Sequence, residues 1–423
     1  MTERCILHCD MNNFYASVEC MLHPPLRGHP VAVCGETEER HGIVLAKNYE
    51  AKAYGVTTGE AVWQAKKKCP GLIVVPPHFE EYLRISARAR EIYGRYTDLV
   101  EPMGLDECWL DVTGSKRFFG TGIDVAEKIR QSIKRELGVT VSIGVSFNKV
   151  FAKLGSDMKK PDAITVIPSD GFRAMIGGLP VSDLFGVGRA TAVKLMRLGV
   201  LTIGDLACYP PEQLEAKFGK CGQMLWRFAN GLDTSRVVTR GIHDLDKTTG
   251  HGITTLADLE NEEEVWPVML ELAQDVGHRL FLYGRRASGV CVSVRDNALM
   301  SRQWQGPLPY PTGSAFVIAT EAFALFRKSY LWTRPIRSLS IRAISLLPAT
   351  VSYQLDFFTD ARAIERREVI DRTVEDIRAR YGAGSIRNAV LLHNPKMPGS
   401  DVLRRSVLNK SGMQDGDGCA RSD

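Results

Sequence analysis

The chain has 423 residues, of which 44% are apolar and 24% are charged, a composition that predicts about two to four compact units and excludes general disorder. Lysine and arginine exceed aspartate and glutamate by five, which is too small an excess to indicate a nucleic-acid partner by itself. The distribution of these charges along the chain therefore has to decide that question.

We expect neither membrane insertion nor secretion. No apolar run approaches the roughly 18 residues that span a bilayer, and the N-terminal segment lacks the basic and then apolar order of a signal peptide. The ten cysteines include no Cys-x-x-Cys pair, and a chain of this length needs no disulfide framework. A cytoplasmic location is therefore expected.

The N-terminal third has the pattern of an α/β unit. Residues 5–11 are predicted to form a short buried strand that carries Asp10 near its end. The segments that follow are predicted as helices at 12–22, 79–97 and 122–138 and as strands at 107–113 and 139–147. In the last of these helices an apolar residue recurs every four positions from Val125 to Leu137, which gives one buried face.

The rest of the chain divides into an all-α part and an α+β part. From Leu179 to about residue 235, helical pieces are separated by Gly and Pro, and the polar stretch 233–250 is the best linker candidate. Beyond it, predicted helices and strands alternate until about residue 348, with helices at 262–284 and 315–331 and strands at 287–296 and 336–347. A charged helix is predicted at 362–381, and the tail from about Pro395 is predicted to be disordered.

The acidic pair Asp106 and Glu107 is the sharpest chemical feature. Neighbouring residues in a strand point to opposite faces, so both acids can serve one site only where a strand begins or bends. Asp10 lies near the end of another predicted strand, and three clustered carboxylates cost several kcal/mol unless cations neutralise them. Magnesium suits such a cluster because it takes oxygen ligands and keeps phosphates in its shell. An acidic pair beside a strand is more often an exposed surface feature, so other motifs have to support this interpretation.

Five motifs supply that support. They lie, in chain order, at 9–19, 47–56, 100–113, 146–164 and 184–206. Together they resemble the Y-family translesion DNA polymerases of the bacterial DNA polymerase IV (DinB/UmuC) type. The resemblance is strong over residues 1–235, weaker through the C-terminal α+β region and absent from the final tail.

The resemblance implies an α+β multidomain right-hand fold. It implies a ferredoxin-like βαββαβ palm, small fingers, an all-α thumb with a helix-hairpin-helix and an α+β little finger. The implied boundaries are palm 1–10 and 75–167, fingers 11–74, thumb 168–235, linker 236–243, little finger 244–350, and a C-terminal part 351–423 with a clamp-binding peptide, a helix and a disordered tail.

The resemblance also implies the chemistry of the site. Asp10, Asp106 and Glu107 would be the catalytic residues and, with the carbonyl of Met11, would hold two Mg²⁺ ions for attack of a primer 3′-hydroxyl on a dNTP. The implied nucleotide-binding residues are Phe14, Tyr15, Tyr49, Lys52 and Lys160.

Tyr15 occupies the position of the family's steric gate. A large ring under the sugar excludes ribonucleotides by a clash with the 2′-hydroxyl. Phe14 and Tyr15 follow a predicted strand, where aromatic residues are usually ordinary core, so only their proximity to Asp10 favours the gate.

Two regions are predicted to bind primer–template DNA. In the helix-hairpin-helix, Gly186 and Gly188 would let the backbone approach a phosphate without reading sequence. Between residues 279 and 342 there are ten basic residues and two acidic ones, an excess typical of a surface that follows the phosphate backbone. The candidate contacts there are Arg285, Arg286, Arg295, Arg337 and Arg342.

Residues 354–358 resemble the peptide by which bacterial polymerases bind the sliding clamp. In such peptides a glutamine and large apolar side chains enter a groove of the clamp, and the matching residues are Gln354, Leu355, Phe357 and Phe358. The alternative is an edge strand that packs on the little finger.

The chain departs from the family pattern at several positions. Asn12 replaces an aspartate, Lys52 an arginine, Gly104 a serine and Ala46 a threonine. Because lysine lacks the bidentate fork of arginine, we expect altered nucleotide affinity with the chemistry intact.

The sequence therefore predicts a monomeric, cytoplasmic, DNA-directed DNA polymerase that performs low-fidelity translesion synthesis without proofreading. One alternative is a catalytically inactive scaffold that binds DNA or the clamp, against which the three acids argue. Another is a nucleotide cyclase with a related palm, which would need neither the thumb nor the basic fourth domain.

Overall fold

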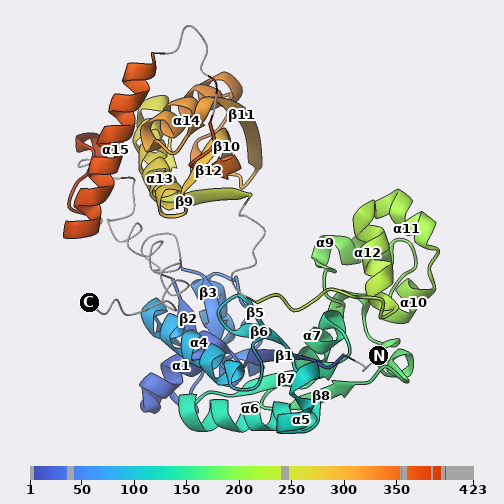
Figure 1. Ribbon diagram of the computed structural model, residues 1–423. Helices are drawn as coiled ribbons and strands as arrows, with labels where there is room; N and C mark the ends of the chain where they lie inside the picture. The colour runs from blue at the N-terminus through green and yellow to red at the C-terminus, as the bar shows by residue number, and fades with distance from the viewer. Residues whose placement is uncertain are drawn as a thin grey trace, which may run out of the picture. The chain divides into compact units, whose positions relative to one another are not determined.

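The computed structural model describes residues 4–35, 42–239, 247–352, 354, 360–382, 384–391 and 396 (Figure 1). The chain forms two compact units, Met1–Cys34 with Val44–Ile242, and Gly35–Ile43 with His243–Asp423. Within the described residues, no helix is both long and apolar enough to cross a membrane.

A five-stranded sheet forms the centre of the first unit. Its order is β5 (Val100–Met103), β6 (Glu107–Asp111), β1 (Ile6–Met11), β7 (Val141–Ser146) and β8 (Ile164–Ile167). β1 is central and pairs antiparallel with β6 and β7. All six residues of β1 are buried, so its two faces must both be covered.

Helices cover both faces of this sheet. α4 (Phe79–Gly94) and α6 (Gly122–Leu137) pack on one face, where Leu7, Cys9 and Met11 point into a shared core. α7 (Lys149–Met158) covers the other face, onto which Ile6, His8 and Asp10 point because side chains alternate along a strand. The carboxylate of Asp10 therefore lies on the α7 side of the sheet.

The close approach of α7 to β7 depends on one glycine. A Cβ at Gly144 would lie 1.8 Å from the carbonyl oxygen of Ala152 and 2.6 Å from the amide of Ser156, both in α7. No residue with a side chain fits at this position without moving the helix. Gly144 thus sets the distance between the sheet and the helix.

A second, three-stranded sheet lies in the same unit. Its order is β3 (Val44–Lys47), β2 (Val31–Cys34) and β4 (Ile73–Val75). The helices of this part are α1 (Phe14–Leu22), α2 (Tyr49–Ala53) and α3 (Val62–Lys68), and a short 3-10 turn, η1, spans Pro24–Leu26. Its small core contains Val44, Ala51, Val62 and Ala65.

The predicted all-α part is present after β8. It consists of α8 (Phe172–Ile176), α9 (Arg189–Met196), α10 (Ile203–Cys208), α11 (Pro211–Phe218) and α12 (Lys220–Ala229), with the 3-10 turn η3 at Val181–Asp183. Its core includes Val150, Phe151 and Leu154, so α7 belongs to this core as well as to the sheet. The remaining short elements of the unit are η2 (Thr113–Ser115) and α5 (Lys116–Phe119).

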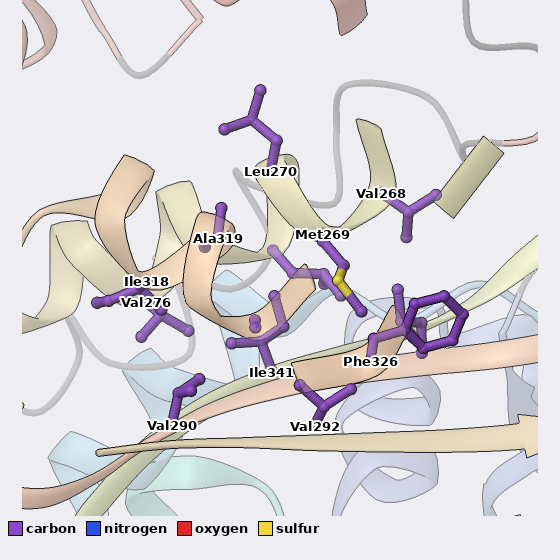
Figure 2. Packing of buried hydrophobic residues seen from close by; sticks show 14 of the residues in the cluster. Val268, Met269, Leu270, Val276, Val290, Val292, Ile318, Ala319, Phe326 and Ile341 are labelled. Atoms are coloured by element: carbon purple, nitrogen blue, oxygen red, sulfur yellow. The ribbon is translucent and has the colours of Figure 1, made fainter. Parts of the chain in front are cut away.

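The second unit is an antiparallel sheet with helices. The strand order is β11 (Ser301–Thr312), β10 (Arg285–Asp296), β12 (Ile336–Pro348) and β9 (Thr248–Leu259). α13 (Glu262–Leu282) and α14 (Ala315–Ser329) pack on one face, and Figure 2 shows Met269, Phe326 and Val276 from these helices above Val292 and Ile341 of the strands. α15 (Ala361–Tyr381) follows, and η4 spans Ala389–Leu391.

Two strands of this sheet were not predicted. The end of the proposed linker stretch, from Thr248, is already part of β9. Strand β11 contains Pro307, Pro309 and Pro311, residues that argue against a strand in sequence. β11 lies at the edge of the sheet. An edge strand tolerates proline because the backbone positions on its outer side need no N–H group to bond to a neighbouring strand.

Replacing Gly144 by alanine tests the contact between β7 and α7. We expect Gly144→Ala to lower the free energy of unfolding by about 1–3 kcal/mol, because the added methyl group overlaps the backbone of Ala152. Gly94→Ala is the control, since a Cβ there meets nothing within 4 Å and alanine favours a helix. Urea unfolding of both variants measures the effect, and equal stability of the two variants would contradict this account.

Candidate active site

The structure brings the three predicted acids to one end of the large sheet. Asp10 of β1 lies directly opposite Glu107, the first residue of β6. Asp106 immediately precedes β6, and its carbonyl oxygen accepts a hydrogen bond of 3.0 Å from the amide of Met11. The acidic pair therefore lies at a strand start, the one place where both side chains can serve a single site.

The three carboxylates influence one another's ionisation. Burial, followed by the charges of Asp10 and Glu107, raises the pKa of Asp106 to about 6. Burial also raises the pKa of Asp10, although Lys160 partly offsets it. Negative charge at this end of the sheet is therefore only partly compensated by the protein.

Two lysines partly neutralise the negative charge of these carboxylates. Lys160 Nζ donates to Asp10 Oδ2 at 2.7 Å and lies 2.9 Å from Asp157 Oδ1. Lys153 Nζ, on α7, donates to Glu107 Oε2 at 2.6 Å. Burial would raise the pKa of Glu107, but its interactions with His8 and Lys153 lower it to about 2. Glu107 is thus held ionised.

His8 is a residue of this site that the sequence interpretation missed. Its buried ring lies with Nε2 3.2 Å from Glu107 Oε2 and Nδ1 2.8 Å from Ser156 Oγ. Burial lowers the pKa of His8, so its ring is neutral near pH 7. Lys153 donates to Glu107 Oε2, and the His8 ring lies beside the same oxygen. The alternation along β1 places His8 on the same face as Asp10, which is the signal that could have found it.

The oxygen atoms of these carboxylates are suitable ligands for a divalent cation. In the part of the chain that the structure describes, no three His, Cys, Asp or Glu side chains converge on a point that could hold a metal ion. Two of the three carboxylates are instead bonded to lysine ammonium groups, which provide positive charge where cations would. Burial and the charges of Asp10 and Glu107 disfavour the ionised form of Asp106 and raise its pKa, an effect that a bound cation would oppose. Hard oxygen ligands of this kind suit Mg²⁺.

The predicted triphosphate residues lie near these acids. Tyr49 begins α2, whose N-cap is Asn48, and Lys52 Nζ lies 5.7 Å from the centre of the Tyr49 ring. Burial raises the pKa of Tyr49, and the charges of Lys160 and Asp10 also act on it. Lys160 therefore contacts Asp10, Tyr49 is close enough to both for their charges to act on it, and Lys52 lies beside the Tyr49 ring.

The predicted gate ring is held in an aromatic cluster. Tyr15 stacks on Tyr82 with centroids 4.2 Å apart and an interplanar angle of 10°, and Phe79 meets Tyr15 edge-on. The hydroxyl of Tyr82 donates to the buried carboxylate of Glu19. Burial raises the pKa of Tyr15, and the charge of Asp106 raises it further. The neighbouring Phe14 is buried in the core.

Two of the departures from the family pattern have a structural role. Asn12 donates from Nδ2 to Ser142 Oγ at 2.9 Å, and its Oδ1 accepts from the amide of Asp162 at 2.9 Å. An amide does both, whereas an ionised carboxylate can only accept. Gly104 has φ 77°, a conformation that favours glycine over serine. Ala46 pairs with Val33 in the small sheet.

Comparisons with known proteins identify the family. The impB/mucB/samB family model matches residues 9–157, its C-terminal domain model matches 246–357, and a model described as DNA polymerase-iota, thumb domain matches 182–233. The chain is 49% identical over 392 residues to the DNA polymerase IV of Acetivibrio thermocellus, covering 93% of this chain and 98% of that protein. The chain belongs to the Y-family DNA polymerases of the DNA polymerase IV type.

Further comparisons agree with this assignment. The DNA polymerase IV 1 of Bacillus subtilis is 38% identical over 417 residues, 97% of this chain and 98% of that protein. A solved Y-family DNA polymerase chimera superposes with a TM-score of 0.72 at 24% identity, covering 81% of this chain and 99% of that one, which shows the fold. The predicted family, α+β fold class and enzyme class of DNA-directed DNA polymerase are confirmed.

The predicted DNA contacts of this polymerase have different environments. Gly186 has φ 90° in the turn before α9, and Gly188 is the N-cap of α9. In the second unit, Arg295 and Arg342 alternate with core residues of β10 and β12, so they lie on the sheet face without helices.

The other predicted arginines lie elsewhere in the second unit. Arg286 is paired with Glu368 of α15 at 3.0 Å, and Arg285 lines the cavity of about 350 Å³ between α15 and α13. Arg337 is partly buried near the start of β12. Of the proposed clamp-binding residues, Gln354 is exposed, whereas Leu355, Phe357 and Phe358 lie outside the described residues, as does the tail beyond Lys396.

The raised pKa of Asp106 gives a test of the site's charge. Ionised Asp106 destabilises the fold above about pH 6, and this cost vanishes below its ordinary pKa of 3.8. With EDTA present, we therefore expect Asp106→Asn to raise the free energy of unfolding at pH 8, by up to about 2–3 kcal/mol, and to change it little near pH 4.

Denaturant unfolding at both pH values measures this difference. Asp98→Asn, in the exposed turn before β5, is the matched control and should have the same small effect at both pH values. A stabilisation by Asp106→Asn that did not depend on pH would contradict the raised pKa.

Proposed function

We propose that this polymerase performs low-fidelity translesion synthesis, adding deoxynucleotides to a primer 3′-hydroxyl by a two-metal mechanism without a proofreading exonuclease. The single observation that supports the chemistry is the partly compensated charge of Asp10, Asp106 and Glu107 where β1 and β6 meet. Phosphoryl transfer needs mainly positioning and charge neutralisation, which carboxylates, cations and a few lysines can provide.

Asp10, Asp106, Glu107 and the main-chain carbonyl of Met11 would hold two Mg²⁺ ions. When bound, these ions would lower the pKa of the primer hydroxyl and neutralise the pyrophosphate that leaves. Lys153 holds Oε2 of Glu107, so it would orient this ligand in the way that outer hydrogen bonds orient metal ligands in other sites, and the His8 ring lies beside the same oxygen.

Tyr49, Lys52 and Lys160 would bind the triphosphate. Lys160 can leave Asp10 once that carboxylate is neutralised, and its ammonium group then becomes available to the phosphates. Lys52 offers a point charge where relatives have a bidentate arginine, so we expect weaker triphosphate affinity with the chemical step intact. Phe14 buries its ring beside Tyr15 and would support the gate.

The remaining parts of the proposal concern partners. Gly186 and Gly188 would bind a phosphate of primer–template DNA, and Arg295 and Arg342 are the little-finger arginines whose position best suits the same role. Residues 354–358 would bind the sliding clamp, and the polymerase would act as a monomer. All cysteines among the described residues are free thiols, which suits the cytoplasm.

Primer extension tests the enzymatic proposal and the alternative of an inactive scaffold. We expect Mg²⁺-dependent extension past a damaged template base, and at least about a hundredfold loss of rate in Asp106→Ala because a metal ligand is removed. Asp98→Ala is the control and should extend normally, since Asp98 is an exposed acid away from the site. Full activity of Asp106→Ala would contradict the metal site, and no extension by the wild type would favour the scaffold.

Ribonucleotide discrimination tests the gate. We expect Tyr15→Ala to raise ribonucleotide incorporation relative to deoxynucleotide incorporation by at least about tenfold, because the ring that would clash with the 2′-hydroxyl is gone. Tyr15→Phe keeps the ring stacked on Tyr82 and should keep the discrimination. The ratio of kcat/KM for the two nucleotides measures the effect. An unchanged ratio in Tyr15→Ala would contradict the assignment.

A further inference from the structure

The helix α3 presents an exposed tryptophan beside two lysines. Val62, Ala65 and Cys69 point into the small core of this part of the molecule. Trp63 is 68% exposed, and Lys66 and Lys67 are exposed three and four positions later. Residues at these spacings share one face of a helix. The outer face of α3 therefore combines an indole ring with two positive charges.

This helix is firmly fixed to the polymerase. The side chain of Gln64 accepts from the amide of Ala61 at the helix start, and Lys68 donates to Glu60 Oε2 at 2.5 Å and to the carbonyl of Gly55 at 3.0 Å. Glu60 also accepts from the amide of Thr57 at 2.9 Å. Trp63 thus lies on a rigid element, and an exposed aromatic residue on a rigid element is suited to binding.

Hydrogen bonds connect the turn before α3 to strand β3. The amide of Gly59 donates to the carbonyl of Val44 at 2.8 Å, which joins the turn before α3 to β3. At the other end of β3, Lys47 Nζ donates to Thr58 Oγ1 at 3.1 Å.

Lys47, the last residue of β3, is close enough to Lys52 for their charges to interact. Burial lowers the pKa of Lys47, and so does the charge of Lys52, which lies over the Tyr49 ring. The turn that leads into α3 is therefore joined, through β3, to the part of the molecule that contains the proposed triphosphate residues.

We propose that Trp63, Lys66 and Lys67 form a binding site for single-stranded DNA, namely the unpaired template just ahead of the templating base. An unpaired base would stack on the indole of Trp63, and the lysines would contact its phosphates. Base stacking suits a strand of any sequence because every base has a π-face. The positive charge favours nucleic acid over an apolar protein partner. The proposal rests on the polymerase activity and goes beyond the chemistry of the catalytic site.

Equilibrium binding of the whole chain tests the proposal. We compare a primer–template with an eight-nucleotide 5′ thymine overhang against a blunt duplex of the same paired length, with EDTA present. We expect Trp63→Ala to weaken binding of the overhang substrate about 5- to 150-fold and binding of the blunt duplex less than about twofold. Trp63→Phe should retain most of the affinity, because a ring remains to stack.

Two further variants complete the design. Phe118→Ala is the matched control, since Phe118 is 81% exposed on α5 and should have no effect on either substrate. Lys66→Ala with Lys67→Ala should reduce the salt dependence of binding to the overhang substrate only, by about 0.7 per phosphate contact in the slope of log K against log salt.

Several results would overturn the proposal. Equal affinity of Trp63→Ala and the wild type for the overhang substrate would do so, and so would an equal loss on both substrates. Because the assay needs neither metal nor nucleotide, a failure of the two-metal proposal would leave this result unaffected.

Discussion

Repulsion among three carboxylates at one end of a sheet is the constraint on which the catalytic part of this molecule depends. Asp10 and Glu107 face each other across paired strands, and Asp106 adjoins them. Protein groups neutralise only part of this charge, through Lys160 on Asp10 and Lys153 on Glu107. Burial, followed by the charges of Asp10 and Glu107, raises the pKa of Asp106. A site with this imbalance is disposed to bind cations, and it costs stability in their absence.

Helix α7 contacts both the carboxylate site and the core of the all-α part of the first unit. It carries Lys153 and Ser156, which hold Glu107 and His8, and its opposite side enters the core of the all-α part through Phe151 and Leu154. Its distance from the sheet is set by Gly144, where any side chain would meet its backbone. A change in the packing of α7 would therefore alter the orientation of a metal ligand as well as stability.

The sequence predicted much of the fold because the signals were local. The acids at 10, 106 and 107, the amphipathic helix at 122–138 and the charged helix near 362–381 follow from periodicity and motif spacing. Alternation along β1 could have placed His8 on the face of Asp10, but its contact with Ser156 and that of Lys153 with Glu107 join residues 148 and 46 positions apart, which no local pattern reveals. Strand β11 was missed because its prolines oppose strand propensity, and only its edge position explains them.

The number of metal ions bound by the complex tests the central claim most directly. Mn²⁺ can replace Mg²⁺ as a spectroscopic probe, and its binding can be measured with primer–template DNA and a non-hydrolysable dNTP present. The account predicts two bound ions for the wild type and a loss of at least one in Asp106→Ala. Two tightly bound ions in Asp106→Ala, or none in the wild type, would contradict it.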